Sequence, residues 1–269
     1  MSVKGIYTAL SGAMAQSQKL DTISNNIANS NTPSFKRDDV VFQEYLTANE
    51  KEQQFMAVPK VPGTLDSFYH MQGGDKSFVD TKGTYTDFSQ GSLKQTGNAL
   101  DVAIDGKGFF EIATPQGVKL TRSGNFTLDG NGQLVTKDGY PVLAAGAGDP
   151  AERVIKLTSV GSIAIGDDGR ISQGENQIAQ LSMVNVKNVD ALVKTGQSLY
   201  GFKSNMNAEV ENIARPSMKQ GFLEMSNVNI VKEMTDMISA HRVFESTQKA
   251  INAYDGMTDK LVNVVGKTN

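Results

Sequence analysis

The segment ALDVAIDGKGFFEIA, at residues 99–113, holds two apolar runs on either side of a glycine-containing turn. Short runs rich in Val, Ile and Phe that flank an Asp-Gly pair are typical of neighbouring β-strands. We predict a strand over 99–104, a turn over 105–108 and a returning strand over 109–113.

The sequence that follows repeats this pattern of short apolar segments and turns. Further turns are predicted at residues 115–117, 129–132, 137–139 and 167–169. Between them lie the β-prone segments 119–121, 125–128, 133–136, 162–165 and 180–186. Strands that recur every 8–12 residues or so are typical of compact antiparallel β domains. The middle of the chain is therefore predicted to form such a domain.

Glycine and proline are confined almost entirely to this middle part. Of the 26 glycines, 22 lie between residues 63 and 221, and all seven prolines lie between residues 33 and 216. Both residue types are unfavourable in helix interiors. The predicted fold class is therefore α+β, with long N- and C-terminal helices that pair as a coiled-coil-like stalk and a central, mainly antiparallel β domain.

The N-terminal segment has the spacing of an amphipathic helix with unusually few charges. Its predicted seam comprises Ile6, Leu10, Ala13, Ser17, Leu20, Ser24 and Ile27. Before Pro33, the only charged side chains are Lys4, Lys19 and Asp21. A solvated helix normally carries many charges on its outer face. The segment is therefore predicted to be enclosed by other protein on several sides. The alternative is a weak helix, partly disordered in the free monomer, and the two interpretations are compatible.

The C-terminal segment predicts a helix of roughly 36 residues, far longer than the average of about 11–12. Residues 226–229 offer several N-cap candidates. The predicted seam comprises Ile230, Met234, Met237, His241, Phe244, Gln248, Ile251, Asp255, Thr258, Val262 and Val265. Its polar members suit register-specific partners better than a simple core.

We divide the chain into four segments on these grounds. They are an N-terminal axial helix at 1–35, an extended connector at 36–76, a central β-rich domain at 77–218 and a C-terminal axial helix at 219–269. Within the connector, Phe42, Tyr45 and Leu46 have a spacing that could continue a helix, whereas Pro59 and Pro62 indicate extended chain.

Composition excludes several classes of protein. The net charge of −3 and the pI near 5.5 give no electrostatic footprint for nucleic acid. No apolar run approaches the ~20 residues of a transmembrane helix, and no cleaved secretory signal is expected. The absence of cysteine removes disulfides and thiolate chemistry. It fits either a cytosolic protein or one used outside the cytoplasm without a classical signal.

No catalytic, cofactor or metal site is predicted. His70 and His241 lack the clustered partners that such a site needs. Residues 129–133 (DGNGQ) open like a calcium loop, but the sixth and twelfth loop positions are Leu134 and Tyr140, so a β-turn is predicted instead. Residues 106–111 (GKGFFE) fail the dinucleotide-binding pattern. The paired carboxylates at 167–168 and at 209 and 211 are expected to be solvated charges.

Three motifs together resemble those of the flagellar rod and hook axial proteins. The first is DTISNNIANSNTPSFKR at residues 21–37. The second is LDVAIDGKGFF at 100–110, followed by TRSGNF at 121–126, Asp129, GQL at 132–134 and GYPVL at 139–143. The third is LEMSNVN at 223–229, followed by Glu233, Met237, Ile238, Arg242, Glu245 and Lys249. They occur in the family's order and cover both ends and the β domain.

Details within the motifs refine this resemblance. Ser34 stands where the family usually has Gly before the Phe, in a turn that we expect to tolerate Ser. The length and single β domain resemble a rod protein more than the larger hook protein. The opening GIYTA at residues 5–9 and the stretch 225–249 are more similar to the proximal than to the distal type of rod protein. The connector also lacks the Gly-Leu-Gln insertion associated with the distal type.

The resemblance implies a non-enzymatic structural subunit of the bacterial flagellar basal-body rod, without a cofactor. Such subunits are exported unfolded through the flagellar type III apparatus and polymerise helically across the periplasm. Expected partners are further copies, other rod proteins and the export apparatus. The resemblance places the assembly interface among Ile6, Leu10, Leu20, Ile27, Phe35, Met234, Met237, Ile238, Phe244 and Ile251.

Three alternatives stay open from the sequence. The first is the distal rod protein of the same family. The second is a β-domain module for cell-wall glycan with a helical dimerisation stalk. The third, ranked below both, is a wall hydrolase that acts through paired carboxylates.

Overall fold

The computed structural model describes residues 4–46, 77–146, 148–157, 162–196, 198–203, 209–213 and 216–265. The chain divides into two compact units. Unit 1 comprises the described residues of Met1–Ile27, Asp38–Tyr85 and Ile230–Asn269, and unit 2 those of Ala28–Arg37 and Thr86–Asn229. Each unit is assembled from stretches that are separate in the sequence, whereas the four predicted segments are continuous.

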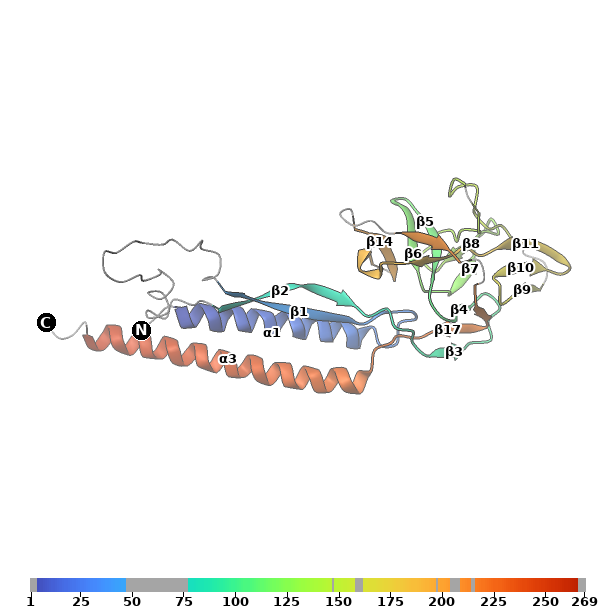
Figure 1. Ribbon diagram of the computed structural model, residues 1–269. Coiled ribbons are helices and arrows are strands. Elements are labelled where there is room, and N and C mark those ends of the chain that lie inside the picture. The colour runs from blue at the N-terminus through green and yellow to red at the C-terminus, as the bar shows by residue number, and fades with distance from the viewer. Residues whose placement is uncertain are drawn as a thin grey trace, which may run out of the picture. The chain divides into compact units, whose positions relative to one another are not determined.

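Unit 1 contains both terminal helices, as predicted. Helix α1 spans Lys4–Ala28 and helix α3 spans Ile230–Val265, which is 36 residues long. The helices run antiparallel (Figure 1). At one end the Asn26 amide donates to Glu233 Oε2 at 3.2 Å. At the other end the Tyr254 ring lies over Gly5, where a Cβ would stand 3.8 Å from the nearest ring carbon.

The predicted seam of α3 consists of two rows of residues, each spaced by seven. The burial pattern supports the row that contains Met237 and corrects the row that contains Met234. Met237, Phe244 and Ile251, spaced by seven residues, are half-buried. The second row contains the buried Glu233 and Ala240, not their neighbours Met234 and His241, which are exposed. Glu233 is accommodated because Asn26 donates to it, so a pattern of apolar residues alone could not place this row.

Unit 1 also contains a two-stranded sheet. Strand β1, Asp38–Leu46, pairs with strand β2, Ser77–Thr86 (Figure 1). The helical spacing of Phe42, Tyr45 and Leu46 was therefore misleading, because all three lie in β1. The run Val40–Val41–Phe42 has the β-branched and aromatic character that favours a strand.

Unit 2 is built from short strands joined by turns, as the glycine pattern predicts. The strands are β3 (Leu93–Gln95), β4 (Val102–Ile104), β5 (Phe109–Thr114), β6 (Gly117–Thr121), β7 (Phe126–Leu128), β8 (Leu134–Thr136), β9 (Ile163–Ile165), β10 (Arg170–Gln173), β11 (Asn176–Gln180), β12 (Met183–Val186), β13 (Leu192–Lys194), β14 (Leu199–Phe202), β15 (Val210–Asn212), β16 (Met218–Gln220) and β17 (Phe222–Glu224). A 3-10 turn covers Val189–Ala191. The pairings with a described register are antiparallel.

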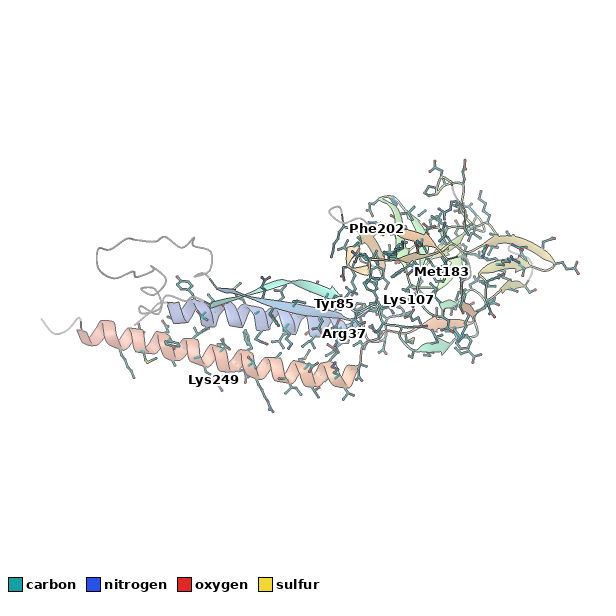
Figure 2. All side chains as sticks on the ribbon, viewed as in Figure 1. Arg37, Tyr85, Lys107, Met183, Phe202 and Lys249 are labelled. Carbon is teal, nitrogen blue, oxygen red and sulfur yellow. The ribbon has the colours of Figure 1, made fainter. Side chains whose placement is uncertain are left out.

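The largest sheet has the strand order β13-β14-β6-β5-β12-β15 and is apolar on both faces. Because successive side chains point to opposite faces, the neighbours Phe109 and Phe110 belong to two different clusters of buried residues. The Phe110 cluster packs against the remaining strands and includes Met183, whereas Phe202 at the end of β14 is 39% exposed (Figure 2). The Phe109 cluster is covered by Phe88, whose ring centroid lies 5.8 Å from that of Phe109.

The pairing of the segment 99–113 differs from the prediction. Both strands exist, but β4 and β5 do not form a hairpin. Strand β4 pairs with β16, whereas β5 pairs with β6 and β12. The turn at 105–108 therefore connects two different sheets. Local turn chemistry predicted where the chain turns, but the partner of β4 is a strand more than a hundred positions away.

Candidate functional site

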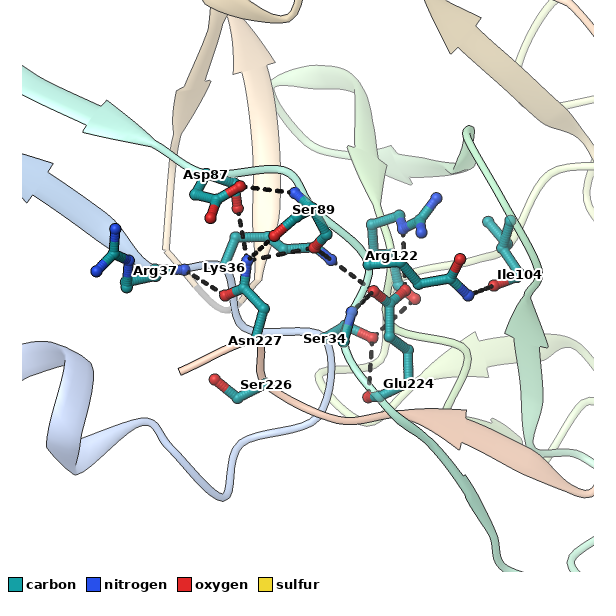
Figure 3. Close-up of polar contacts among 12 residues, drawn as sticks. Ser34, Lys36, Arg37, Asp87, Ser89, Ile104, Arg122, Glu224, Ser226 and Asn227 are labelled. Atoms are coloured by element: carbon teal, nitrogen blue, oxygen red, sulfur yellow. Dashed lines mark hydrogen bonds and ion pairs between the residues drawn. The ribbon is translucent and has the colours of Figure 1, made fainter. Parts of the chain in front are cut away.

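The three sequence motifs meet at one buried polar cluster in unit 2, which we call the junction. It consists of Ser34 and Lys36 from the first motif, Arg122 from the second, and Glu224 and Asn227 from the third (Figure 3). In the sequence, residues 34–37 follow helix α1 and residues 224–227 precede helix α3. The junction therefore anchors both chain segments that lead to the terminal helices.

Glu224 is the centre of the junction. Its Oε1 accepts hydrogen bonds from Lys36 Nζ at 2.5 Å and from the Gly91 amide at 2.9 Å. Its Oε2 accepts from Arg122 Nε at 3.0 Å. Buried charges are tolerated in proteins when they are paired and fully hydrogen-bonded. Both oxygens of this carboxylate meet that condition.

The two cations are also satisfied by backbone carbonyls. Lys36 Nζ donates to the Ser89 carbonyl at 2.7 Å. Arg122 Nη1 donates to the carbonyls of Gly106 at 2.8 Å and Gly108 at 2.7 Å. Among the described residues, no buried side-chain polar atom is without a hydrogen-bond partner.

The junction holds two cations and one anion. The side chains of Lys36 and Glu224 are 0% exposed and that of Arg122 is 4% exposed. Burial lowers the pKa of Lys36 from its ordinary value of 10.5. The Glu224 charge opposes this shift, whereas the Arg122 charge adds to it. The junction is therefore an unfavourable site for the lysine in its charged form.

Asn227 links the N-terminal segment to the β unit. Its Oδ1 accepts from the Arg37 amide at 2.8 Å, and its Nδ2 donates to the Asp87 carbonyl at 2.9 Å. The Asp87 amide in turn donates to the Arg37 carbonyl at 2.8 Å. One amide side chain thus connects three separate parts of the chain.

Ser34 occupies a backbone conformation that favours glycine. Its φ is positive, in the left-handed region, and its side chain is buried. Its Oγ donates to the Arg122 carbonyl at 2.8 Å and its amide donates to the Glu224 carbonyl at 2.8 Å. The turn tolerates Ser, as expected, because the hydroxyl has a partner there.

The ten residues predicted for the assembly interface are spread over α1, α3 and the latter part of the first motif. Leu10, Met234 and Ile238 are exposed, whereas the other seven are half-buried. Phe35 lies beside the junction, with the Lys194 ammonium 4.3 Å from the centre of its ring. The predicted interface omits several exposed large apolar side chains of the two helices. They are Tyr7, Met14, Ile230, Val231, Val243, Tyr254 and Met257, of which Met14 and Val231 are the most exposed. A signal for three of them was available in the sequence, because Tyr7 and Met14 lie three and four residues from Leu10, and Val231 lies three residues from Met234.

The other candidate sites gain no support from the described residues. The Gly132 amide donates to the Asp129 carbonyl at 3.0 Å, which confirms the β-turn predicted there. Lys187 Nζ lies 2.9 Å from Glu209 and 2.7 Å from Glu211, and it holds the pKa of Glu209 below its usual range. His241 is exposed, and His70 lies outside the described residues. The described part of the chain holds no group of metal-ligating side chains.

Models of known protein families match three parts of the chain. They are the flagella basal body rod protein at residues 6–36, the flagellar hook protein FlgE/F/G D1 domain at 103–173 and the flagellar basal body rod FlgEFG protein C-terminal region at 219–264. The flagellar basal-body rod protein FlgG of Bacillus subtilis is 37% identical over 275 residues, covering 97% of this chain and 99% of the relative. The chain belongs to the flagellar basal-body rod protein family.

Other relatives in the family carry two names. FlgF of Rhizobium meliloti is 37% identical over 97% of this chain and 98% of the relative. FlgF of Caulobacter vibrioides is 32% identical over 98% of each. As a member of the rod family, the chain is a structural subunit of the flagellar basal body and not an enzyme. No helix in the described ranges is long and apolar enough to cross a membrane.

Each of the three family regions contributes at least one side chain to the junction. Lys36, Arg122 and Glu224 all lie within the motifs, but the sequence did not predict that they meet. The available signal is clearest for Glu224, a charged residue between the apolar Leu223 and Met225. Such a residue must either be exposed or find a partner of opposite charge.

Proposed function

We propose that this rod subunit polymerises helically through its two terminal helices, which pair as a coiled-coil-like stalk. The observation that carries the proposal is the position of two exposed apolar stripes in unit 1. One stripe on α1 consists of Tyr7, Leu10 and Met14, and one on α3 consists of Val231, Met234 and Ile238. Their spacing of three and four residues puts each set on one helix face.

The stripes lie at opposite ends of the antiparallel helix pair. The α3 stripe is level with the Asn26–Glu233 hydrogen bond, whereas the α1 stripe lies in the half of α1 that begins beside Tyr254. Met14 is 66% and Val231 is 72% exposed in the monomer. Apolar side chains gathered at such exposure are typical of interaction surfaces.

Two different patches at opposite ends favour head-to-tail contact between copies. If the α1 stripe of one subunit covers the α3 stripe of the next, each subunit keeps one free stripe and addition continues. Heterologous contacts of this kind generate open helical polymers when the rotation does not close. The low charge of α1 fits this role, because neighbouring subunits and not water would meet its faces.

We further propose the proximal rod type and export in an unfolded state by the flagellar type III apparatus. The opening residues 5–9 and the missing Gly-Leu-Gln insertion support the proximal type. The distal type is the second candidate, because the relatives include proteins named FlgG as well as FlgF. The absence of cysteine is compatible with assembly beyond the cytoplasm.

Deletion of the gene, followed by electron microscopy of purified basal bodies, tests this proposal. The proximal type predicts basal bodies that stop before the distal rod forms, and complementation with the intact gene restores the rod. Basal bodies with a completed proximal rod would instead assign the distal type. Complete flagella in the deletion strain would contradict both.

A further inference from the structure

Residues 34–37, which we call the latch, contact the rest of unit 2 in a different way from the C-terminal segment 216–227. We infer that the latch is separable. The rest of unit 2 keeps its strands and its charge balance without the latch, and the latch can leave and rejoin while the β strands stay folded. The C-terminal segment, in contrast, is an obligatory part of unit 2. The physical inference rests on the junction alone, and its biological meaning rests on the proposed function.

Loss of Lys36 and loss of Glu224 have different effects on the charge balance of the junction. Without Lys36, the buried Arg122 and Glu224 form a balanced pair. Without Glu224, the junction keeps two buried cations and no anion. Breaking a buried pair is strongly destabilising when it leaves an uncompensated charge. Only the loss of the C-terminal segment has that consequence.

The hydrogen bonds are unequal in the same way. When the latch leaves, Glu224 keeps the Gly91 amide and the Arg122 guanidinium, and Asn227 keeps the Asp87 carbonyl. Arg122 keeps both of its carbonyl partners, at residues 106 and 108. The two buried charged side chains, Arg122 and Glu224, therefore stay hydrogen-bonded after the latch departs, whereas the half-buried Asn227 side chain loses only the Arg37 amide at its Oδ1.

The C-terminal segment, by comparison, supplies strands to the unit. Strand β16 pairs with β4, and strand β17 pairs with β3. Met218 and Leu223 are buried. The Met225 carbonyl approaches Gly91 so closely that a Cβ there would stand 2.0 Å from the carbonyl oxygen. Removing this segment would take backbone pairing, apolar burial and charge balance away together.

A separable latch gives the subunit a defined order of events. Unit 2 is completed when residues 216–227 reach it, and the latch engages as a second step. In a rod subunit, the segment after α1 could then be placed while the β domain is already folded. Such partial opening corresponds to a local unfolding unit below the global transition.

Amide hydrogen exchange in the full-length protein tests the inference. The Ser34 and Asp87 amides donate to latch contacts, at the Glu224 and Arg37 carbonyls. The Met225 and Val102 amides donate to carbonyls outside the latch, at residues 92 and 124. We expect the two latch amides to exchange at least tenfold faster than the other two. Equal rates in all four would overturn the inference.

Two variants test the charge argument in the same experiment. Lys36→Met should leave the exchange rates of Met225 and Val102 within about twofold of the wild type, whereas Glu224→Gln should raise them more than a hundredfold. Acceleration of both amides by Lys36→Met to the same extent as by Glu224→Gln would show one indivisible core and overturn the inference. If Glu224→Gln does not fold, the double variant Lys36→Met with Glu224→Gln should be more stable than Glu224→Gln alone. The exchange rates of the four amides in the wild type then still test the inference.

Lys219→Met is the matched control for the lysine change. Lys219 forms an ion pair with Asp105 at 2.8 Å, but both side chains are more than 40% exposed. Exposed pairs contribute little to stability. This variant should leave the latch amides unchanged, whereas Lys36→Met should speed their exchange; equal effects on the latch would count against the inference. None of these rates depends on flagellar assembly, so failure here is distinguishable from failure of the rod proposal.

Discussion

The ammonium of Lys36 lies 2.5 Å from the Glu224 carboxylate, although 188 positions separate the two residues in the sequence. This contact joins the N-terminal and C-terminal motifs of the rod family inside one unit. Arg122 adds a second cation to the same carboxylate. Because the junction carries more positive than negative charge and excludes water, its stability must respond to protonation of Lys36.

Stability should rise with pH in the range where Lys36 loses its proton. The folded-state pKa of Lys36 is lowered by burial, whereas the unfolded value is near 10.5. Between these two values the unfolded chain binds more protons than the folded one. The free energy of unfolding therefore increases with pH, by at most about 1.4 kcal/mol per pH unit for one group. Below the folded-state pKa, Lys36 is charged in both states, so its contribution to the free energy of unfolding no longer changes with pH and is unfavourable.

Urea unfolding of the wild type and of Lys36→Met, followed by circular dichroism up to about pH 10.5, measures this effect. The difference between the two free energies isolates Lys36 from the other groups that titrate in this range. The free energy of unfolding of the wild type should increase relative to that of Lys36→Met as the pH rises. A difference that stays flat or falls would show that Lys36 is not held in an unfavourable charged state.

Ser34 allows a matched pair of substitutions. Ser34→Ala keeps the positive φ and removes the hydroxyl that donates to the Arg122 carbonyl, so it should destabilise the protein by about 1.5 kcal/mol. Ser34→Gly removes the same hydrogen bond but relieves about 1 kcal/mol of backbone strain. It should remain within about 0.5 kcal/mol of the wild type.

Thermal or urea unfolding of the two variants distinguishes these effects. The order of stability should be wild type and Ser34→Gly together, with Ser34→Ala below both. If Ser34→Ala is as stable as Ser34→Gly, the hydroxyl and not the backbone conformation decides what this position accepts.

The elements of the fold followed from local sequence to different degrees. Both terminal helices were predicted because their apolar residues recur at three and four positions and their interiors lack proline. Several central strands were predicted from the turns around them. Strand β1 was not predicted, because Phe42, Tyr45 and Leu46 match a helical spacing by chance. The partner of β4 was unpredictable from local residues, because β16 lies at the other end of the unit.

The junction shows a similar limit for the site. Its residues lie inside the three motifs, but spacing along the chain carries no information on contacts across 188 positions. The buried Glu233 on α3 also escaped a prediction based on apolar residues. Polar residues become predictable only when their partners are known, because burial of a charge depends on pairing and not on hydropathy.

Gly124 should be intolerant of any side chain. A Cβ at this position would stand 1.6 Å from the Val102 carbonyl oxygen, so Gly124→Ala must displace β4 from its place in unit 2. Overpacking of this kind costs about 3 kcal/mol. Gly130 is the matched control, since a Cβ there meets nothing within 4 Å, and Gly130→Ala should change stability by less than about 0.5 kcal/mol. Similar unfolding midpoints for the two variants would contradict the close approach.

The exposed stripe on α3 gives the most direct test of assembly. Replacing Met234 and Ile238 together by glutamine removes apolar surface that the monomer already exposes, so the folding of the subunit should change little. Contact with the next subunit should weaken, because about 25 cal/mol is lost for each Å² of apolar surface that remains in water. A strain carrying only this variant should swim poorly and yield few complete rods in electron micrographs. Ser239→Ala, an exposed polar change directly after Ile238, is the control and should leave motility at the wild-type level. Normal motility of the glutamine variant, at normal protein levels, would remove the α3 stripe from the rod interface.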